Sequence, residues 1–442
     1  MTRRYFIETH GCSLNFSDSE YMEGRLEEAD FLRAETPESA DIIILNTCTV
    51  KDRTYYNFLN RLSFYENLQR QKGEGKSSAL LIAGCIPRAM PDDPHLANHA
   101  ILGADAVGEV AEVAEAVLRG EKPHRLEPLH PVPRLNLPIR RRNPVIEILP
   151  IARGCLGACA YCQTRAARGE LKSYPVEDIV HHARKALEEG VKEIWLTAQD
   201  TGAWGLDLES SLPDLLSAVL AIPGEFRIRL GMANPNHVAQ FTAPLLELFS
   251  DRRLFRFLHL PLQSGSNRVL KAMNRNYTAD EFLRICETFY THDSDFSIAT
   301  DVIAGLPGET EDDFQQTLNV LEKIRPAVIN RSRYSPRPGT PAALMPQHPQ
   351  AVISERSRRL TELVERISLE KNRRWVGEHC HVLIDVCKRD GSVISRNDYY
   401  KSIVISLAGR TPEETARLKP GTFCEVEVRQ ATTYHLIAEP VK

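Results

Sequence analysis

The first 120 residues alternate short apolar runs with polar or amphipathic stretches. The runs "RYFIET" (4–9), "DIIILN" (41–46) and "ALLIAG" (79–84) have the length and composition of buried strands, and each precedes a more polar stretch such as "DSEYMEGRLEEA" (18–29). Strands that alternate with helices in this way form a parallel sheet with helices on both faces. We therefore expect an α/β fold that begins with a doubly wound parallel sheet domain over residues 1–120.

A proline-rich segment, 121–144, separates this block from the next. Its six prolines predict a largely extended linker, and its "RLNLPIRRR" stretch (134–142) is a compact basic patch. A solvated linker explains most such patches, and contact with a polyanion is the alternative.

The alternation resumes over residues 145–350. Six units of strand and helix suit a partial (β/α)6 barrel better than an open two-layer sheet, and such barrels place their chemistry at the carboxyl ends of the strands. The six strand-like runs are "VIEILPIA" (145–152), "EIWLTA" (193–198), "FRIRLGM" (226–232), "RFLHLPL" (256–262), "SIATDVIA" (297–304) and "AVINRSRY" (327–334).

The last part of the chain has a different pattern. Residues 351–374 predict one long connecting helix, "AVISERSRRLTELVERISLEKNRR". Residues 375–442 contain short strand-like runs separated by turn residues, which predicts a small β-barrel. Those runs are "CHVLIDVC" (380–387), "SIVISL" (402–407), "FCEVEVRQ" (423–430) and "TYHLIAE" (433–439).

Composition is that of an ordinary globular protein. The 442 residues are 42% hydrophobic and 26% charged, the start lacks the apolar stretch of a secretory signal, and no run approaches the ~18 apolar residues of a membrane span. These features predict a cytoplasmic protein without a membrane partner. Thiols stay reduced there, so ten cysteines indicate metal or catalytic use rather than a disulfide framework. With a net charge of -4, binding to nucleic acid requires local basic patches.

Three cysteines lie within eight positions of "RGCLGACAYCQTRAARG" (153–169), directly after the first barrel strand. A structural zinc site needs two ligands beyond the pair Cys159 and Cys162, and the nearest histidines, 181 and 182, lie in an amphipathic helix where we expect them at the surface. A thiol redox pair leaves Cys155 without a role. Three thiolates do suit an iron-sulfur cluster that keeps one iron open.

The N-terminal domain holds a second set of three cysteines. Cys12, Cys48 and Cys85 each follow a predicted strand within a few residues. Because the carboxyl ends of parallel strands share one edge of a sheet, these cysteines are expected to meet in space, unless each is only a small buried hydrophobe. The four other cysteines lie in apolar or mixed contexts and are expected in cores: Cys286, Cys380, Cys387 and Cys424.

The C-x-x-x-C-x-x-C motif at the first strand of such a barrel resembles the radical S-adenosylmethionine superfamily. With three spaced N-terminal cysteines, "QSGSNRVLKAMNR" (263–275), "TDVIAGLPGET" (300–310), "YSPRPGTPA" (334–342) and a terminal β-barrel, almost the whole chain resembles the methylthiotransferase family. The resemblance implies two 4Fe-4S clusters, one on Cys155, Cys159 and Cys162 and one on Cys12, Cys48 and Cys85. It also implies S-adenosylmethionine on the open iron of the first cluster and a terminal TRAM-like domain that binds RNA.

The residues after the third barrel cysteine narrow the type within that family. "CQTRAARG" (162–169) resembles archaeal and eukaryotic enzymes that act on N6-threonylcarbamoyladenosine in tRNA, and "LTAQDTGAWG" (196–205), "RLGMANP" (229–235) and "RPGTPAA" (337–343) agree with that type. The implied reaction adds a methylthio group to C2 of this base, next to the anticodon. A 5′-deoxyadenosyl radical would remove the hydrogen at C2, which is far too weak an acid for any protein base.

The resemblance also implies contacts with the S-adenosylmethionine. Tyr161 is expected near its adenine, with simple packing as the alternative. Gln199 and Asp200 are expected at the methionine amino group, with solvated loop positions as the alternative. Gln263, Ser264 and Gly305 fall where the family lines the cofactor pocket, although "GLPG" is also consistent with a plain turn.

Five residues are candidates for contact with RNA. "SRNDYYKS" (395–402) combines Arg396, Tyr400 and Lys401, which suits phosphate contact and base stacking, with a solvated hairpin as the alternative. Arg333 and Arg337, near the expected barrel mouth, are candidates for contact with the anticodon loop.

The implied partners are tRNA, a low-potential electron donor of the ferredoxin or flavodoxin type, and a sulfur donor. Two rival functions stay open: the same chemistry on isopentenyladenosine in tRNA or on an aspartate of a ribosomal protein, and a non-enzymatic iron-sulfur or zinc protein that binds RNA.

Overall fold

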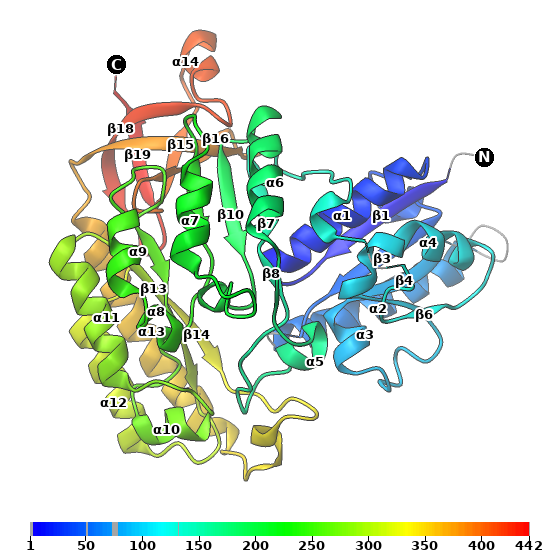
Figure 1. Cartoon of the computed structure of the whole chain (residues 1–442), viewed down its shortest axis with the longest axis horizontal. Helices are drawn as coiled ribbons and strands as arrows, with labels where there is room; N and C mark the ends of the chain where they lie inside the picture. Colours follow the sequence, from blue (N-terminus) through cyan, green and yellow to red (C-terminus); the bar gives the residue numbers. More distant parts are fainter. Residues whose placement is uncertain (1–2, 50–51, 73–77, 131, 442) are drawn as a thin grey trace.

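The computed structural model describes residues 3–49, 52–72, 78–130 and 132–441 (Figure 1). Its first part is a parallel six-stranded sheet in the order β2-β1-β3-β4-β5-β6. All three predicted strands are present, as β1, β3 and β4, and β2, β5 and β6 extend the sheet at its two edges. The strands are β1 (Arg4–Thr9), β2 (Leu32–Arg33), β3 (Ile42–Thr47), β4 (Ala79–Gly84), β5 (Ala100–Gly103) and β6 (His124–Arg125).

Helices cover both faces of this sheet because its central strands are apolar on both sides. Ile42 and Ile44 of β3 pack against α1 (Ser13–Glu28) and α4 (Val110–Leu118). Ile43 and Leu45 point the other way, toward α2 (Asp52–Lys72). The short helix α3 (Cys85–Ala89) begins directly at the end of β4. The predicted doubly wound parallel domain is confirmed.

The middle of the chain forms an open barrel of six parallel strands, called the central barrel below. It consists of two three-stranded sheets, β11-β10-β7 and β12-β13-β14, which parallel bridges from Ile228 to Leu254 and from Met232 to His259 connect. Every predicted strand is present. The strands are β7 (Ile146–Pro150), β10 (Glu193–Thr197), β11 (Arg227–Leu230), β12 (Phe257–His259), β13 (Ser297–Ala304) and β14 (Val328–Arg333).

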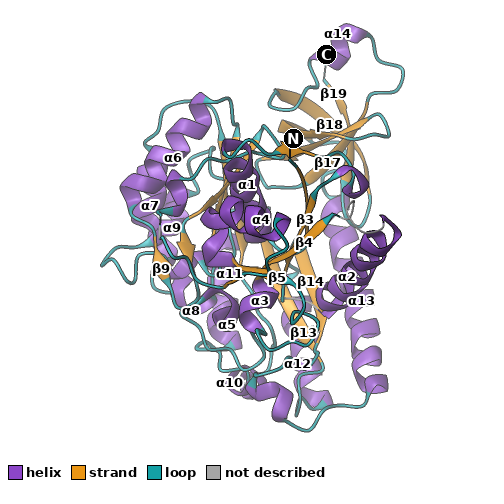
Figure 2. Cartoon of the chain, turned by 90° about the vertical axis from the view of Figure 1, so that its right-hand side faces the viewer, coloured by secondary structure: helices purple, strands orange, loops and turns teal. Residues whose placement is uncertain are grey.

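Helices surround the outside of the central barrel (Figures 1 and 2). Residues such as Ile194 and Ile228 point outward and pack with the helices in one large core, so the alternate residues point into the barrel. The covering helices include α6 (Val176–Glu188), α7 (Leu212–Leu220), α9 (Thr242–Leu248), α11 (Ala279–His292), α12 (Glu311–Ile324) and α13 (Gln350–Arg373). The last of these matches the predicted connecting helix within one residue at each end.

The C-terminal strands close into a five-stranded barrel, called the terminal barrel, in the order β15-β16-β17-β19-β18 (Figure 2). The pattern predicted four of its strands and missed β16, whose end overlaps the segment "SRNDYYKS". The terminal barrel packs against the amino ends of the central strands: Leu383 and Phe423 contact Ile146 and Ile148. Its strands are β15 (His379–Cys387), β16 (Ser392–Asn397), β17 (Ser402–Ser406), β18 (Phe423–Ala431) and β19 (Leu436–Pro440), with a short helix α14 (Pro412–Ala416).

The basic patch of the linker is neutralised by protein carboxylates rather than by solvent. Arg142 bonds the buried Glu23 of α1 at 2.8 Å, and Arg141 pairs with Glu189 at 2.6 Å and also with the buried Glu147 of β7. The expectation of a solvated linker is therefore wrong. These ion pairs tie α1 to the first strand of the central barrel.

Two further expectations about single residues are also wrong. His182 is buried rather than exposed, because its ring bonds Glu147 at 3.0 Å and the Leu135 carbonyl oxygen at 3.1 Å. Cys387 is exposed rather than in a core, since it is the last residue of β15. In the part of the chain that is described, no helix is both long and apolar enough to cross a membrane.

Candidate functional site

The N-terminal cysteines, Cys12, Cys48 and Cys85, come together at the carboxyl edge of the first sheet. Cys12 begins α1 after β1, Cys48 directly follows β3, and Cys85 begins α3 after β4. The Cys12 thiol donates to Asn15 Oδ1 at 3.3 Å, and Asn15 Nδ2 lies 3.8 Å from the Cys85 sulfur. The backbone of Gly11 is so close to Cys48 that a β-carbon there would lie 2.6 Å from Cys48 Cβ, and its φ of +130° favours glycine.

The environment of these thiols favours thiolate at Cys12. A hydrogen bond with Cys48 and the positive charge of Arg168 lower the pKa of Cys12 to about 6, although burial acts in the other direction. Burial raises the pKa of Cys85, even though Arg168 opposes that shift. Arg168 is therefore the cation that both thiols share.

Arg168 comes from the central barrel, at the end of the short helix α5 (Thr164–Arg168). Its Nε donates to the Cys85 sulfur at 3.3 Å, and its Nη2 donates to Asp18 of α1 at 2.6 Å. Asp18 also pairs with Arg134 of the linker, and all three charged groups are buried or nearly so. The two arginines hold the pKa of Asp18 below its usual range against the effect of burial.

The barrel cysteines, Cys155, Cys159 and Cys162, lie on the loop that follows β7. The small strands β8 (Ala152–Arg153) and β9 (Lys172–Ser173) pair and enclose this loop together with α5. A β-carbon on Gly157 would lie 3.6 Å from the Cys155 sulfur and 3.7 Å from the Cys159 sulfur, so both thiols surround that glycine. The Cys162 sulfur accepts from the Thr164 backbone N–H at 3.3 Å.

Burial dominates the titration of two barrel cysteines. It raises the pKa of Cys155 to about 12, and it also raises the pKa of Cys162. The third thiol has a cationic partner, because Arg275 Nη1 donates to the Cys159 sulfur at 3.2 Å. Thiols that resist ionisation in the protein alone become thiolates when a metal binds them, since the metal stabilises the anion.

A chain of hydrogen bonds runs from Cys159 to Asp200. Arg275 also donates to Asn234 Oδ1, and Asn234 Nδ2 donates to Asp200 Oδ2 at 2.5 Å. The other Asp200 oxygen accepts from the backbone N–H groups of Gly202 at 3.1 Å and Asn234 at 3.0 Å. Asp200 is buried, so the alternative of a solvated loop residue is wrong for it, whereas Gln199 is half-buried.

The other expected cofactor contacts lie on neighbouring strand ends. Tyr161 packs against a small buried cluster that includes Val269 and Leu306, and burial raises the pKa of its hydroxyl well above the usual value. Gln263 follows β12, and its buried Oε1 has no hydrogen-bond partner among the described residues. Such an orphaned acceptor fits a site that a bound group completes.

Ser264 and Gly305 are engaged within the protein. Ser264 Oγ lies 3.3 Å from Thr317 Oγ1 of α12. A β-carbon on Gly305 would lie 2.8 Å from Ile353 Cγ1 of α13, so the glycine, at φ +84°, lets α13 pack against this loop. The space beside Gly305 is thus filled by the protein.

Both cysteine groups fit iron-sulfur clusters by their chemistry. Among the described residues, no group of three or more His, Cys, Asp or Glu side chains has the spacing to hold a single metal ion. A cluster binds each thiolate on a different iron, so its ligands stand farther apart than those of one ion. The cations Arg168 and Arg275 beside the sulfurs suit the negative charge of a thiolate-bound cluster.

The elements that carry the two groups meet at the domain boundary, where α3 lies beside α5 (Figure 1). Ser13, the residue after Cys12, places its Oγ 2.9 Å from Thr197 Oγ1 at the end of β10. Arg337 donates to the carbonyl of Thr49, next to Cys48, and its charge acts on Cys162. The N-terminal domain therefore covers the carboxyl end of the central barrel.

The RNA expectation needs correction at three residues. Arg396 pairs with Asp385 at 3.2 Å and lies over the Tyr400 ring, and Tyr400 packs on Phe255 and Phe257 at the base of the central barrel. Lys401 is buried, and its Nζ donates to Asn372 Oδ1 at 3.0 Å. Tyr400 thus joins the two barrels, Arg396 is paired within the terminal barrel, and Lys401 is held by the connecting helix α13. Arg333, in contrast, is exposed at the end of β14.

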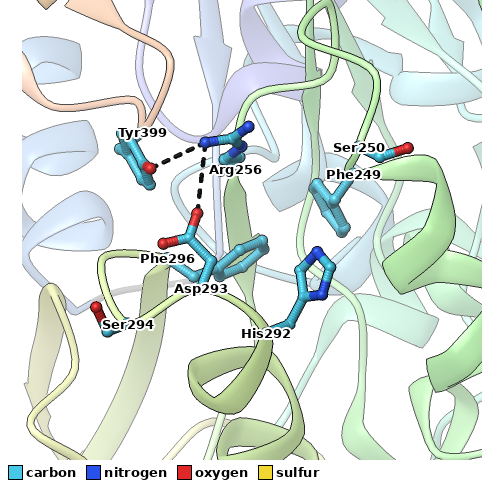
Figure 3. Close-up of a pocket in the computed structure, with 8 residues that line it drawn as sticks. All are labelled: Phe249, Ser250, Arg256, His292, Asp293, Ser294, Phe296 and Tyr399. Atoms are coloured by element: carbon cyan, nitrogen blue, oxygen red, sulfur yellow. Dashed lines mark hydrogen bonds and ion pairs between the residues drawn. The ribbon is translucent and has the colours of Figure 1, made fainter.

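A pocket lies at the opposite end of the central barrel (Figure 3). Arg256 and Phe296, which precede β12 and β13, line it together with Tyr399 of the terminal barrel. Arg256 Nη1 donates to the Tyr399 hydroxyl at 2.9 Å and lies 3.5 Å from Asp293 Oδ2. Because the cysteines lie at the carboxyl ends of the strands, this pocket is separate from them.

Sequence reasoning missed the side chains that organise the two cysteine groups. They are Asn15, Asp18, Arg168, Asn234 and Arg275. The quoted stretches "TRAARG", "MANP" and "KAMNR" contain the last three, but nothing in their spacing relates them to a particular sulfur.

Comparisons with known proteins identify the families that this chain resembles. Residues 4–102 match the model of the uncharacterized protein family UPF0004, and residues 149–321 match the radical SAM superfamily. A probable threonylcarbamoyladenosine tRNA methylthiotransferase of Pyrococcus horikoshii is 39% identical over 99% of both chains. The threonylcarbamoyladenosine tRNA methylthiotransferase of Homo sapiens is 34% identical over 99% of this chain and 74% of its own.

Solved structures give the same fold at low identity. The radical S-adenosylmethionine methyltransferase TsrM from Kitasatospora setae, solved with cobalamin and a [4Fe-4S] cluster, is 14% identical with a TM-score of 0.57. The match covers 78% of this chain and 74% of that chain.

Proposed function

This chain belongs to the family of threonylcarbamoyladenosine tRNA methylthiotransferases, and on that premise we propose that it adds a methylthio group to C2 of N6-threonylcarbamoyladenosine beside the anticodon of tRNA. The observation that carries the proposal is that the elements carrying the two three-cysteine groups meet at the domain boundary. Arg168 of the central barrel donates to the Cys85 sulfur of the N-terminal domain, and Ser13 of the N-terminal domain contacts Thr197 of the central barrel. In this proposal the base would be held between the two groups.

The residues divide into two cofactor sites. Cys155, Cys159 and Cys162 would hold one 4Fe-4S cluster, and Cys12, Cys48 and Cys85 would hold the other. When bound, the clusters and S-adenosylmethionine supply radical abstraction of a hydrogen atom, the sulfur and the methyl group, chemistry that no side chain provides.

The protein's own residues orient and shield that site. Arg275 and Arg168 place a cation beside one sulfur of each group, and Asp200 fixes the Asn234 side chain that holds Arg275. Gln263 offers an unused acceptor to S-adenosylmethionine, and Tyr161 offers an aromatic surface beside the barrel cysteines. The N-terminal domain limits the entry of water and stray hydrogen donors.

The partners follow from this chemistry. A ferredoxin or flavodoxin type protein would supply low-potential electrons, and a separate donor would restore the sulfur. We place the enzyme in the cytoplasm, where thiols stay reduced and tRNA is available. Arg333, exposed at the end of β14, is the candidate contact for the anticodon loop, and Arg337 contributes from the N-terminal domain boundary.

Nucleoside mass spectrometry of tRNA tests the substrate. A strain without the gene should lack 2-methylthio-N6-threonylcarbamoyladenosine and regain it when the gene is restored. If that nucleoside is unchanged while methylthio-isopentenyladenosine or a methylthiolated ribosomal aspartate disappears, the substrate is one of the alternatives.

Anaerobic reconstitution tests the class of protein. We expect about two 4Fe-4S clusters per chain and 5′-deoxyadenosine on reduction with S-adenosylmethionine. Bound zinc, or clusters without any cleavage of S-adenosylmethionine, would instead support a non-enzymatic RNA-binding protein.

A further inference from the structure

Arg229, in the middle of β11, points into the central barrel. Its neighbours Ile228 and Leu230 pack outward against the helices, so Arg229 lies on the inner face. Three aromatic rings surround its guanidinium: Trp195 at 5.3 Å, Phe257 at 5.6 Å and Tyr400 of the terminal barrel at 5.4 Å. Contacts with ring faces hold a guanidinium in place and leave N–H groups on its edge available.

The guanidinium of Arg229 makes no short polar contact. Among all residues that the structure describes, none accepts a hydrogen bond from it or forms an ion pair with it, although its charge acts on the nearby Glu193, and the residue is only half-buried. The neighbouring carboxyl groups are engaged elsewhere: Glu193 accepts from Trp195 Nε1, and Asp385 pairs with Arg396. Burial raises the pKa of both carboxyl groups, although the charge of Arg229 acts against that shift at Glu193.

The strand register places Arg229 relative to the cysteines. Arg229 pairs in register with Trp195 of β10, and Thr197, two residues farther along that strand, contacts Ser13 beside Cys12. Two residues of a strand span about 6.6 Å. The backbone of Arg229 therefore lies below Thr197 on the inner wall of the same barrel, and its guanidinium lies beside Tyr400 on the side of the terminal barrel.

The proposed substrate carries a group that matches such a cation. In N6-threonylcarbamoyladenosine, the threonine nitrogen is acylated and the carboxyl group stays free, so it is ionised at neutral pH. The substituent extends from N6, away from the C2 edge of the base. With C2 at the level of the cysteines, the carboxylate points along the barrel wall.

We propose that Arg229 binds the threonine carboxylate of the substrate and selects it over an uncharged N6 substituent. This inference rests on the proposed function and assigns the part of the site that recognises the modification. A guanidinium matches a carboxylate with two parallel hydrogen bonds, and aromatic walls exclude competing water. An isopentenyl group offers no such anion and would leave the cation unpaired.

Equilibrium binding to two RNAs tests this role without turnover. The reconstituted holoenzyme is titrated anaerobically, without reductant, with an anticodon stem-loop that carries N6-threonylcarbamoyladenosine and with the same stem-loop carrying plain adenosine. The wild-type protein should prefer the modified RNA. In Arg229→Gln the affinity for the modified RNA should fall by about 10-fold to 100-fold, the scale of a lost charge-assisted bond, with less than about a twofold change for the plain RNA.

Two further variants separate recognition from folding. Arg229→Lys keeps the charge but lacks the planar fork, so part of the preference should return. Arg252→Gln is the matched control, because Arg252 is exposed and pairs with Glu225 at the surface, and its preference should equal that of the wild-type protein. Iron content and melting temperature are measured for each variant.

The outcomes distinguish the inference from the proposed function. If the wild-type protein binds both RNAs equally, the proposed substrate is wrong. If the wild-type protein discriminates and Arg229→Gln discriminates equally well, Arg229 does not bind the carboxylate. Equal loss of affinity for both RNAs with a lower melting temperature would show that Arg229 only joins the two barrels.

Discussion

The Nε of Arg168 lies 3.3 Å from the sulfur of Cys85, although the two residues belong to different domains. Arg168 comes six residues after Cys162, the last of the barrel cysteines. One short helix thus connects the two cysteine groups: it begins beside one and ends on the other. Its second contact, with Asp18 at 2.6 Å, ties α5 of the barrel to α1 of the N-terminal domain.

Replacing Arg168 with Gln should loosen that connection. The buried Asp18 would keep only Arg134 as a cationic partner, and breaking a buried pair costs about 3–5 kcal/mol. We expect a lower melting temperature of the apoprotein and faster amide hydrogen exchange in α3 and α5. Arg165→Gln is the control on the same helix, since its exposed pair with Glu170 contributes at most about 1 kcal/mol. Equal effects of the two variants would contradict the role of Arg168.

A Cys→Ser substitution at any one cysteine of either group should remove the cluster of that group and keep the other cluster. Iron and sulfide analysis with Mössbauer spectroscopy should then give about half of the wild-type cluster content, because each group would supply three thiolates to one cluster under the proposed assignment. The exposed Cys387 provides the control, and Cys387→Ser should keep both clusters. Loss of both clusters from every single variant would indicate one shared site.

The substitution Asp200→Asn should weaken the binding of S-adenosylmethionine. The new amide N–H group would face another donor, Asn234 Nδ2, in place of the carboxylate oxygen that now accepts from it. The Asn234 side chain should then rotate, and Arg275 would lose the contact that holds it beside Cys159. We expect about 10-fold weaker binding by anaerobic equilibrium dialysis, the scale of one charge-assisted hydrogen bond. The exposed Asp92 serves as the control in Asp92→Asn. An unchanged dissociation constant in Asp200→Asn would rule out this network as a support of the pocket.

Because Lys401 is buried, we expect the free energy of unfolding to rise at high pH. Burial lowers its pKa from 10.5 to about 8, so between these values the unfolded chain binds more protons than the folded protein. Stability should therefore rise as pH increases from 8 to 10.5, by at most about 3 kcal/mol. The measurement is thermal melting of each variant across this pH range. Lys401→Met should lack the rise in stability. Lys419→Met, the control at an exposed lysine, should show the same rise as the wild-type protein. An identical pH profile in wild type and Lys401→Met would contradict the burial of this charge.

Hydrophobic periodicity sufficed to predict most elements because buried strands and amphipathic helices are local patterns. It identified all six central strands and the long connecting helix. It missed β16 because "SVISRNDYY" combines a short apolar alternation with charged and aromatic residues that also suit an exposed hairpin. The same ambiguity placed Arg396, Tyr400 and Lys401 at an RNA surface, although Arg396 is paired, Lys401 is buried and Tyr400 packs on the central barrel.

The linker shows that charge patterns alone do not identify the partner of a basic segment. A run of three arginines is consistent with solvent, with a polyanion or with protein carboxylates, and the sequence does not tell these apart. Glu23 and Glu147, the partners of Arg142 and Arg141, lie in other elements, and only folding brings them to the linker.

The sequence by itself determined the chemistry of this protein: two sets of three cysteines, each placed after predicted strands, and the motifs that resemble one family of radical enzymes. Those features are local, since a strand, the turn after it and a cysteine spacing are encoded within a few residues. The tertiary structure alone decided which side chains lie beside the sulfurs and which residues line the inner wall of the barrel. Arg168 reaches Cys85 across 83 positions and Arg229 meets Tyr400 of another domain, and such contacts depend on how whole elements pack.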